Sequence, residues 1–79
     1  MKDIQTKTLV EALIGNAGNL QQINFMAEVK AELISRGKDR ETLEILIGNA
    51  IALKTPGIED PMVVSGTVKK LKEELIKED

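Results

Sequence analysis

The 79-residue chain lacks cysteine, histidine, tryptophan and tyrosine, and Phe25 is its only aromatic residue. Without cysteine or histidine it cannot form a disulfide framework, a thiol nucleophile or a zinc site of the usual kind. The Ser-His and Cys-His pairs of nucleophilic catalysis are excluded for the same reason. We therefore predict a protein that is not an enzyme, with no catalytic residue, no bound metal and no cofactor.

Glu28 and Glu32 are the nearest approach to a chemical site, because residues four apart share one face of a helix. Carboxylate metal sites in four-helix proteins also use Glu-x-x-His motifs, however, and the chain has no histidine. We interpret the two glutamates as part of a solvated helix face.

The chain has little excess charge of either sign, since 11 Lys and Arg stand against 13 Asp and Glu for a net charge of −2. Its most basic stretch, residues 36–54, has four basic and three acidic residues. A nucleic-acid surface needs clustered cations and commonly adds aromatic side chains for stacking, which argues against one here. A small nucleic-acid-binding regulator remains an alternative, built on the third predicted helix and four nearby cations: Arg36, Lys38, Arg40 and Lys54.

Long hydrophobic runs are absent as well. The longest apolar run, residues 45–53, is interrupted by Gly48 and Asn49 and is far shorter than the ~20 residues of a membrane span. Residues 1–7 carry three charges and lead into no apolar segment of the signal-peptide kind. We expect no membrane contact and a cytoplasmic protein, in the host cytoplasm if the gene is viral.

Apolar residues instead recur at the spacing of one helix face in four segments, about 4–17, 20–35, 40–54 and 61–77. Turns that contain glycine or proline separate these segments. We predict a single all-α domain over residues 1–79, with four short helices arranged as two helical hairpins in a small bundle. The second helix is apolar over much of its circumference, so we expect it to be central.

The predicted helix ends carry residues that favour them. Asp and Asn side chains accept hydrogen bonds from first-turn amides, and glycine adopts the left-handed conformation after a last turn. The predicted N-caps are Asp3, Asn19, Asp39 and Asp60, although the last helix has Ser65 as an alternative start. The predicted C-terminal glycines are Gly18 and Gly37.

The small size predicts self-association. A 60-residue domain buries only about 60% of its unfolded surface, and large aromatic side chains are nearly missing here. Small scaffolds compensate with metals, disulfides or oligomerisation, and the first two lack their ligands in this chain. Phe25, Ile45 and Ile51 lie off the main apolar stripes, which favours a homodimer or a larger homo-oligomer.

A ten-residue segment occurs twice. Residues 11–20, EALIGNAGNL, and residues 44–53, EILIGNAIAL, agree at seven positions with an offset of 33. A glycine inside a helix costs about 1 kcal/mol relative to alanine, so the repeated Leu-Ile-Gly-Asn-Ala needs a compensating role.

We predict that Gly15 and Gly48 lie where two helices cross closely, within one chain or between two chains. Asn16 and Asn49 would then bond each other or an exposed carbonyl near a helix end. The alternatives are that the Gly-Asn pair marks a frayed or bent helix end, or that it forms a ligand site.

Phe25, Met26 and Val29 lie on the wide apolar face of the second helix and form a candidate face for a partner, because aromatic and flexible side chains anchor interfaces. The alternative is that Phe25 belongs to the core. We recognise no family from these residues.

These features lead to the hypothesis of a non-enzymatic protein-interaction module that self-associates. It would act as a small regulator, adaptor or inhibitor of another protein, a class that includes phage-encoded inhibitors. One alternative is the small nucleic-acid-binding regulator described above. Another is a small-molecule binder or sponge with its site between subunits.

Overall fold

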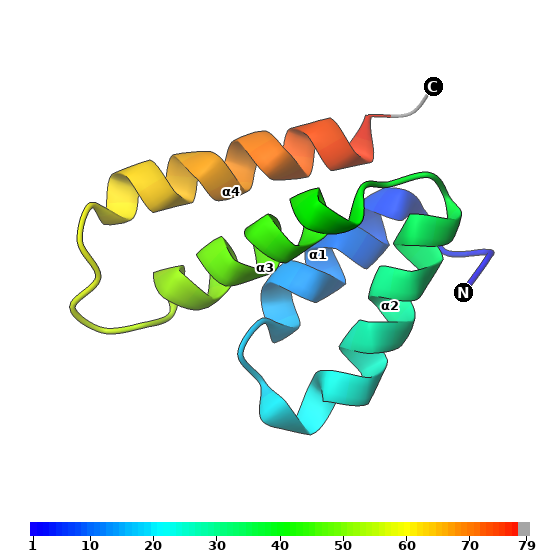
Figure 1. Cartoon of the computed structure of the whole chain (residues 1–79), viewed down its shortest axis with the longest axis horizontal. Coiled ribbons are helices and arrows are strands. Elements are labelled where there is room, and N and C mark those ends of the chain that lie inside the picture. Colours follow the sequence, from blue (N-terminus) through cyan, green and yellow to red (C-terminus); the bar gives the residue numbers. More distant parts are fainter. Residues whose placement is uncertain (78–79) are drawn as a thin grey trace.

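The computed structural model describes residues 1–77, of which 74% are in helices and none in strands. Its elements are α1 (Thr6–Asn16), a short 3-10 helix η1 (Leu20–Gln22), α2 (Ile23–Ser35), α3 (Arg40–Leu53) and α4 (Pro61–Ile76), as Figure 1 shows. The all-α prediction is confirmed, and the helices begin and end close to the predicted positions. None of the helices within residues 1–77 combines the length and the apolar character that a membrane span requires.

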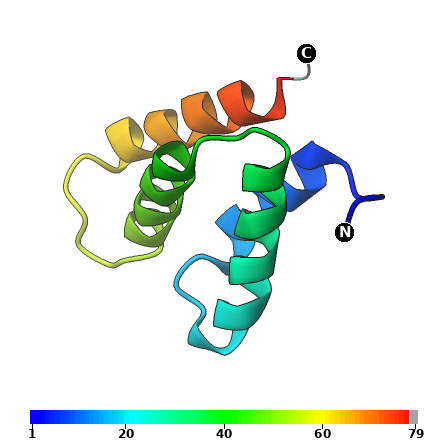
Figure 2. The same cartoon turned by 45° about the vertical axis from the view of Figure 1, so that its right-hand side comes forward.

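The core lies where the four helices meet and consists of leucine and valine side chains. α1 and α3 each contact the three other helices, whereas α2 packs mainly against α1 (Figure 2). The expectation of a central second helix is therefore wrong, because α2 packs mainly on α1 and only slightly on α3. The buried core residues are Leu9, Val10 and Leu13 of α1, Val29 and Leu33 of α2, Leu43 and Leu46 of α3, and Val68 and Leu75 of α4.

Local signals set three of the turns as predicted. The carboxylate of Asp39 accepts a hydrogen bond from the amide of Thr42 at 2.9 Å, which caps the start of α3. Gly37 follows α2 with a φ of 91°, and Gly18 follows α1 with a φ of 83°. Both glycines thus adopt the left-handed backbone that ends a helix at little steric cost.

The predicted cap at Asp3 is wrong. α1 begins at Thr6 after Gln5, and Gln5 makes no side-chain cap. Arg36, at the end of α2, holds this region instead, because its guanidinium donates to the buried hydroxyl of Thr6 at 3.1 Å and to the carbonyl of Met1 at 2.9 Å. The start of α1 is therefore held by a contact between residues 30 positions apart and not by the predicted local cap.

Asp60 is the residue before α4, as predicted, but its side chain makes no capping hydrogen bond. Its φ of 50° and ψ of 57° are left-handed, whereas side-chain capping uses an extended backbone. Pro61 disfavours the right-handed helical conformation at the residue before it. Asp is one of the few non-glycine residues that tolerate the left-handed alternative.

Candidate functional site

The C-terminal half of α3 is uncharged around its whole circumference. Residues 45–53 contain no Asp, Glu, Lys or Arg. A helix that is apolar on every side is normally buried on every side. In the described chain α3 buries Leu46 and Ala50, yet Ile45 and Ile51 remain exposed. One face of α3 therefore lacks the cover that its sequence favours.

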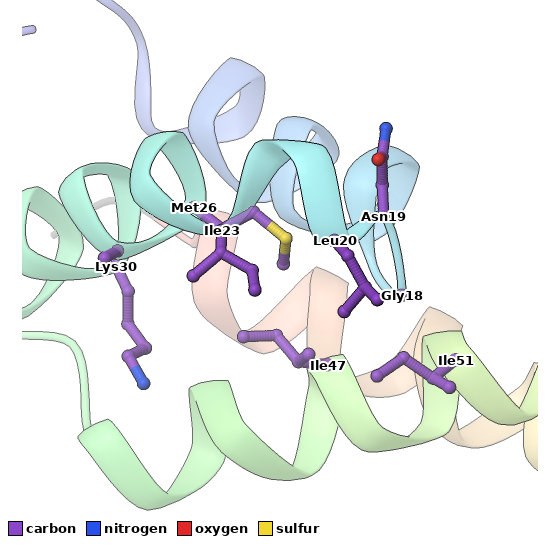
Figure 3. A pocket seen from close by; sticks show the side chains of 9 residues that line it. Gly18, Asn19, Leu20, Ile23, Met26, Lys30, Ile47 and Ile51 are labelled. Carbon is purple, nitrogen blue, oxygen red and sulfur yellow. The ribbon is translucent and has the colours of Figure 1, made fainter.

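A cleft of about 320 Å³ lies beside this face, between α3 and the segment formed by η1 and the start of α2. Figure 3 shows side chains from the η1–α2 segment converging on those of α3. We name this feature the α2–α3 cleft; its lining residues are Gly18, Asn19, Leu20, Ile23, Met26, Ala27, Lys30, Ile47 and Ile51.

The turn between α1 and α2 keeps one wall of the cleft open to solvent. Gly18 reverses the chain with its left-handed backbone, and the side chain of Asn19 accepts a hydrogen bond from the amide of Gln21 at 3.1 Å, which starts η1. The two aliphatic residues that follow are poorly covered: Leu20 is 79% exposed and Ile23 is 57% exposed.

Lys54 holds that turn in place from the end of α3. Its ammonium group donates to the carbonyls of Ile14 at 2.8 Å, Gly15 at 2.9 Å and Ala17 at 3.1 Å. The last carbonyls of a helix have no partner within the helix and carry partial negative charge, so a cation there is favourable. Lys54 thus ties the end of α1, which leads into the turn, to the end of α3.

Lys30 supplies the only charge among the lining residues of the cleft that the structure describes. Its ammonium nitrogen lies 3.9 Å from a carboxylate oxygen of Glu44, the long limit for an ion pair. Its side chain is 28% exposed, so Nζ can accept a second acidic partner. The cleft can therefore bind an aliphatic group that has a carboxylate beside it.

The repeated Gly-Asn pairs do not form a helix crossing within the chain. No atom of another helix lies within 4 Å of where a Cβ would stand on Gly15 or Gly48. The two asparagines do not bond each other either. Asn16 donates to the carbonyl of Ala12, four residues earlier, at 2.8 Å, and Asn49 makes the equivalent bond at 2.8 Å. A crossing between two chains stays a prediction.

The structure separates the three residues of the predicted partner face. Val29 is 0% exposed and belongs to the core, so it is removed from that face. Phe25 is 38% exposed and does not line the cleft. Met26 alone lies in the cleft. The more exposed aliphatic residues nearby, Leu20 and Ile23, were missed because an apolar residue at a helix start is ordinarily assigned to the core.

The four cations of the nucleic-acid alternative are largely engaged with this chain. Lys54 caps α1 as described, Arg36 holds the N-terminal residues, and Lys38 donates to the carbonyl of Lys77 at 3.4 Å. These contacts leave less donor capacity for phosphate oxygens on three of the four side chains.

The two glutamates that share a face of α2 have different surroundings. Glu32 accepts a hydrogen bond from Nε of Arg36 at 2.9 Å, whereas Glu28 is exposed. Residues 1–77 contain no group of three carboxylates close enough together to hold a metal ion.

Comparison of the chain with protein family models, with curated proteins and with solved structures gives no match.

Proposed function

We propose that the protein is a non-enzymatic interaction module that self-associates through the α2–α3 cleft and the exposed face of α3. The observation that carries this proposal is the concentration of uncovered aliphatic side chains there: Leu20, Ile23, Ile45 and Ile51 are all exposed. Leu20, Ile23 and Ile51 line the same cleft, and exposed apolar side chains brought together in this way are typical of an interaction site. The pairing of α1 with α2 and of α3 with α4 as two hairpins is part of the proposal.

The exposed area supports a partner on this surface. A monomer of 8.7 kDa is expected to expose about 4,700 Å², and the chain exposes 5384 Å². The chain thus exposes roughly 650 Å² more than the average relation gives for a compact monomer of this mass. A second copy of the chain is a suitable partner, because it exposes apolar side chains of the same kind and is always present.

The same surface gives the module its biological action. By exchanging a second copy for another protein, it acts as a regulator, adaptor or inhibitor, with no chemistry of its own. The support for binding rather than catalysis is the sequence, which has no histidine and no cysteine for a Ser-His or Cys-His pair.

The test is the mass of the chain in solution. The expected result is a mass above 8.7 kDa at tens of micromolar in sedimentation velocity or light scattering. Ile23→Glu places a charge in the cleft and should return the chain to the monomer mass. Asn24→Glu is the matched control, because it adds the same charge to the next residue, which is exposed and does not line the cleft.

Circular dichroism checks that both variants remain helical, and Ile23 is exposed enough for the charge to be tolerated in a monomer. A wild-type chain that stays at 8.7 kDa throughout this concentration range contradicts the proposal. Equal loss of assembly in the two variants contradicts the assignment to the cleft.

A second candidate is small-molecule binding in the same cleft. Its volume of about 320 Å³ falls at the lower end of the 300–1,000 Å³ typical of ligand sites, and aliphatic walls with one polar group are the usual lining. Mass spectrometry of the purified chain, first native and then denatured, should release a bound compound from the wild type and none from Ile23→Glu.

A further inference from the structure

The start of α4 carries a second uncovered apolar group, preceded by two acids. Met62 is 86% exposed and Val63 is 66% exposed. Glu59 and Asp60 directly precede Pro61 and are exposed as well. No side chain of the described residues covers this pair of aliphatic groups, although α4 buries Val68 and Leu75 further along. We name residues 59–63 the α4 start segment.

We propose that the α4 start segment of one copy docks in the α2–α3 cleft of a second copy. This inference rests on the self-association proposed above and names the occupant of the cleft. The segment brings exposed aliphatic side chains beside carboxylates, and the cleft presents aliphatic walls beside one ammonium group at Lys30. Apolar burial supplies the attraction, and opposite charges set the orientation.

The distance between the apolar group and the charged group is similar in the cleft and in the α4 start segment. In the cleft Lys30 follows Met26 by four residues, one helical turn of about 6 Å. In the segment Asp60 precedes Met62 by two residues, with a left-handed backbone at Asp60 and Met62 in the first turn of α4, so their separation along the backbone is below the about 7 Å of two extended residues. The two separations are of the same order, so the proposed docking directs the Asp60 carboxylate toward Lys30 when Met62 lies near Met26.

Charge favours this direction of docking. Residues 55–64 carry two acidic and no basic residues. Lys30 has only the long contact of 3.9 Å to Glu44, so a carboxylate from a second copy can form a shorter pair. Because the cost of taking two charges out of water offsets most of their attraction, the pair sets the orientation of docking and the aliphatic side chains supply most of the affinity.

The segment and the cleft are different patches of one chain. Figures 1 and 2 both show the start of α4 well away from η1, so a chain does not fill its own cleft. Each copy therefore has one segment and one cleft to offer. Two copies can make the contact twice, each segment in the other's cleft, which gives a two-fold dimer, or copies can join head to tail in a ring or filament.

The test pairs two variants that each lose one half of the contact. Ile23→Glu blocks the cleft and keeps the segment, and Met62→Glu blocks the segment and keeps the cleft. We expect each variant alone to be a monomer at concentrations where the wild type assembles. An equimolar mixture should form a heterodimer of twice 8.7 kDa and nothing larger, because only one productive contact remains.

A charge reversal tests the orientation. Lys30→Glu and Asp60→Lys should each weaken assembly about fivefold, the factor that corresponds to the loss of an ion pair of about 1 kcal/mol. The double variant should recover most of that loss. Lys69→Glu is the matched control, since Lys69 is exposed on α4 and does not line the cleft.

The outcomes distinguish docking of the α4 start segment from self-association in general. Assembly that survives Met62→Glu but not Ile23→Glu overturns the segment as occupant and leaves self-association standing. A mixture of the two variants that stays monomeric also overturns it. A wild type that never assembles overturns both. Met62→Gln serves as the second segment variant if Met62→Glu loses helical circular dichroism, and it should show the same complementation with Ile23→Glu.

Discussion

The two copies of the repeated segment, residues 11–20 and 44–53, share seven of ten residues and yet end differently. The first copy ends a helix, because α1 stops at Asn16. The second continues through α3 to Leu53. The difference arises after the shared Leu-Ile-Gly-Asn-Ala, where the first copy has Gly-Asn and the second has Ile-Ala. A glycine inside this repeat therefore does not end a helix; the two residues that follow decide.

Shared residues take matching local roles in spite of the different endings. Leu13 and Leu46, at the same position in each copy, are both 0% exposed. Glu11 pairs with Lys72 at 3.0 Å, and Glu44 lies 3.9 Å from a lysine of α2. The asparagine of each copy donates to the carbonyl four residues earlier. The repeat is thus a local helical unit that the fold uses twice.

The largest expected effect comes from removing the shared core leucine. Leu13→Ala and Leu46→Ala should each lower the free energy of unfolding by about 2–5 kcal/mol, because each leaves a cavity in the core. Urea unfolding measures both. Leu20→Ala is the control, since a side chain that is 79% exposed should change stability by less than about 0.5 kcal/mol. A loss confined to one copy would show that the two are not equivalent.

Next in size is the position where the copies diverge. Gly18→Ala forces a Cβ onto a backbone with a φ of 83°, which should lower the free energy of unfolding by about 1–2 kcal/mol. Space is not the obstacle, because that Cβ would meet Ile51, the counterpart of Gly18 in the second copy, at an ordinary 3.6 Å.

Gly18→Asn separates strain from packing in the same measurement. Asn tolerates the left-handed conformation better than Ala does, so it should lose less stability although it is larger. If Gly18→Asn is the more damaging change, contact with Ile51 matters more than backbone strain.

The third effect tests the cap that only the first copy has. Lys54→Met removes the donor to three carbonyls at the end of α1 and should lower the free energy of unfolding by roughly 1 kcal/mol. Hydrogen exchange should speed up around residues 17–20 and stay unchanged within α3. Lys69→Met loses the same charge at an exposed site on α4 and should leave both quantities unchanged.

Local patterns in the sequence predicted the helices and the turns at Gly18, Gly37 and Asp39, because spacing and capping act between near neighbours. The roles of Arg36 and Lys54 could not be predicted in this way. Their hydrogen bonds join residues 30 to 40 positions apart, and nothing in the neighbouring sequence indicates the distant partner.

The cleft could not be predicted from local patterns, because it forms only where whole helices pack against each other. The pattern marked Ile51 as lying off the stripe of its helix, but it could not show that this residue lines the same cleft as Ile23. The glycine prediction failed within the chain for the same reason. The repeated Leu-Ile-Gly-Asn-Ala suggested a crossing at Gly48, whereas the fold leaves open space beside Gly48.

The smallest expected effect is opposite in sign and compares the two glycines. Gly48 lies inside α3 with open space at its Cβ position, so Gly48→Ala should raise the free energy of unfolding of the monomer by about 0.5–1 kcal/mol through helix propensity alone. Gly15 lies in the last turn of α1, where helix ends fray, so Gly15→Ala should gain less stability.

Urea unfolding below the assembly concentration measures the stability of both variants, and light scattering above that concentration measures their assembly. If two chains cross at Gly48, Gly48→Ala stabilises the monomer and weakens assembly; if they do not, stability rises and assembly is unchanged. A Gly48→Ala variant that loses monomer stability would contradict the open space seen on this face of α3.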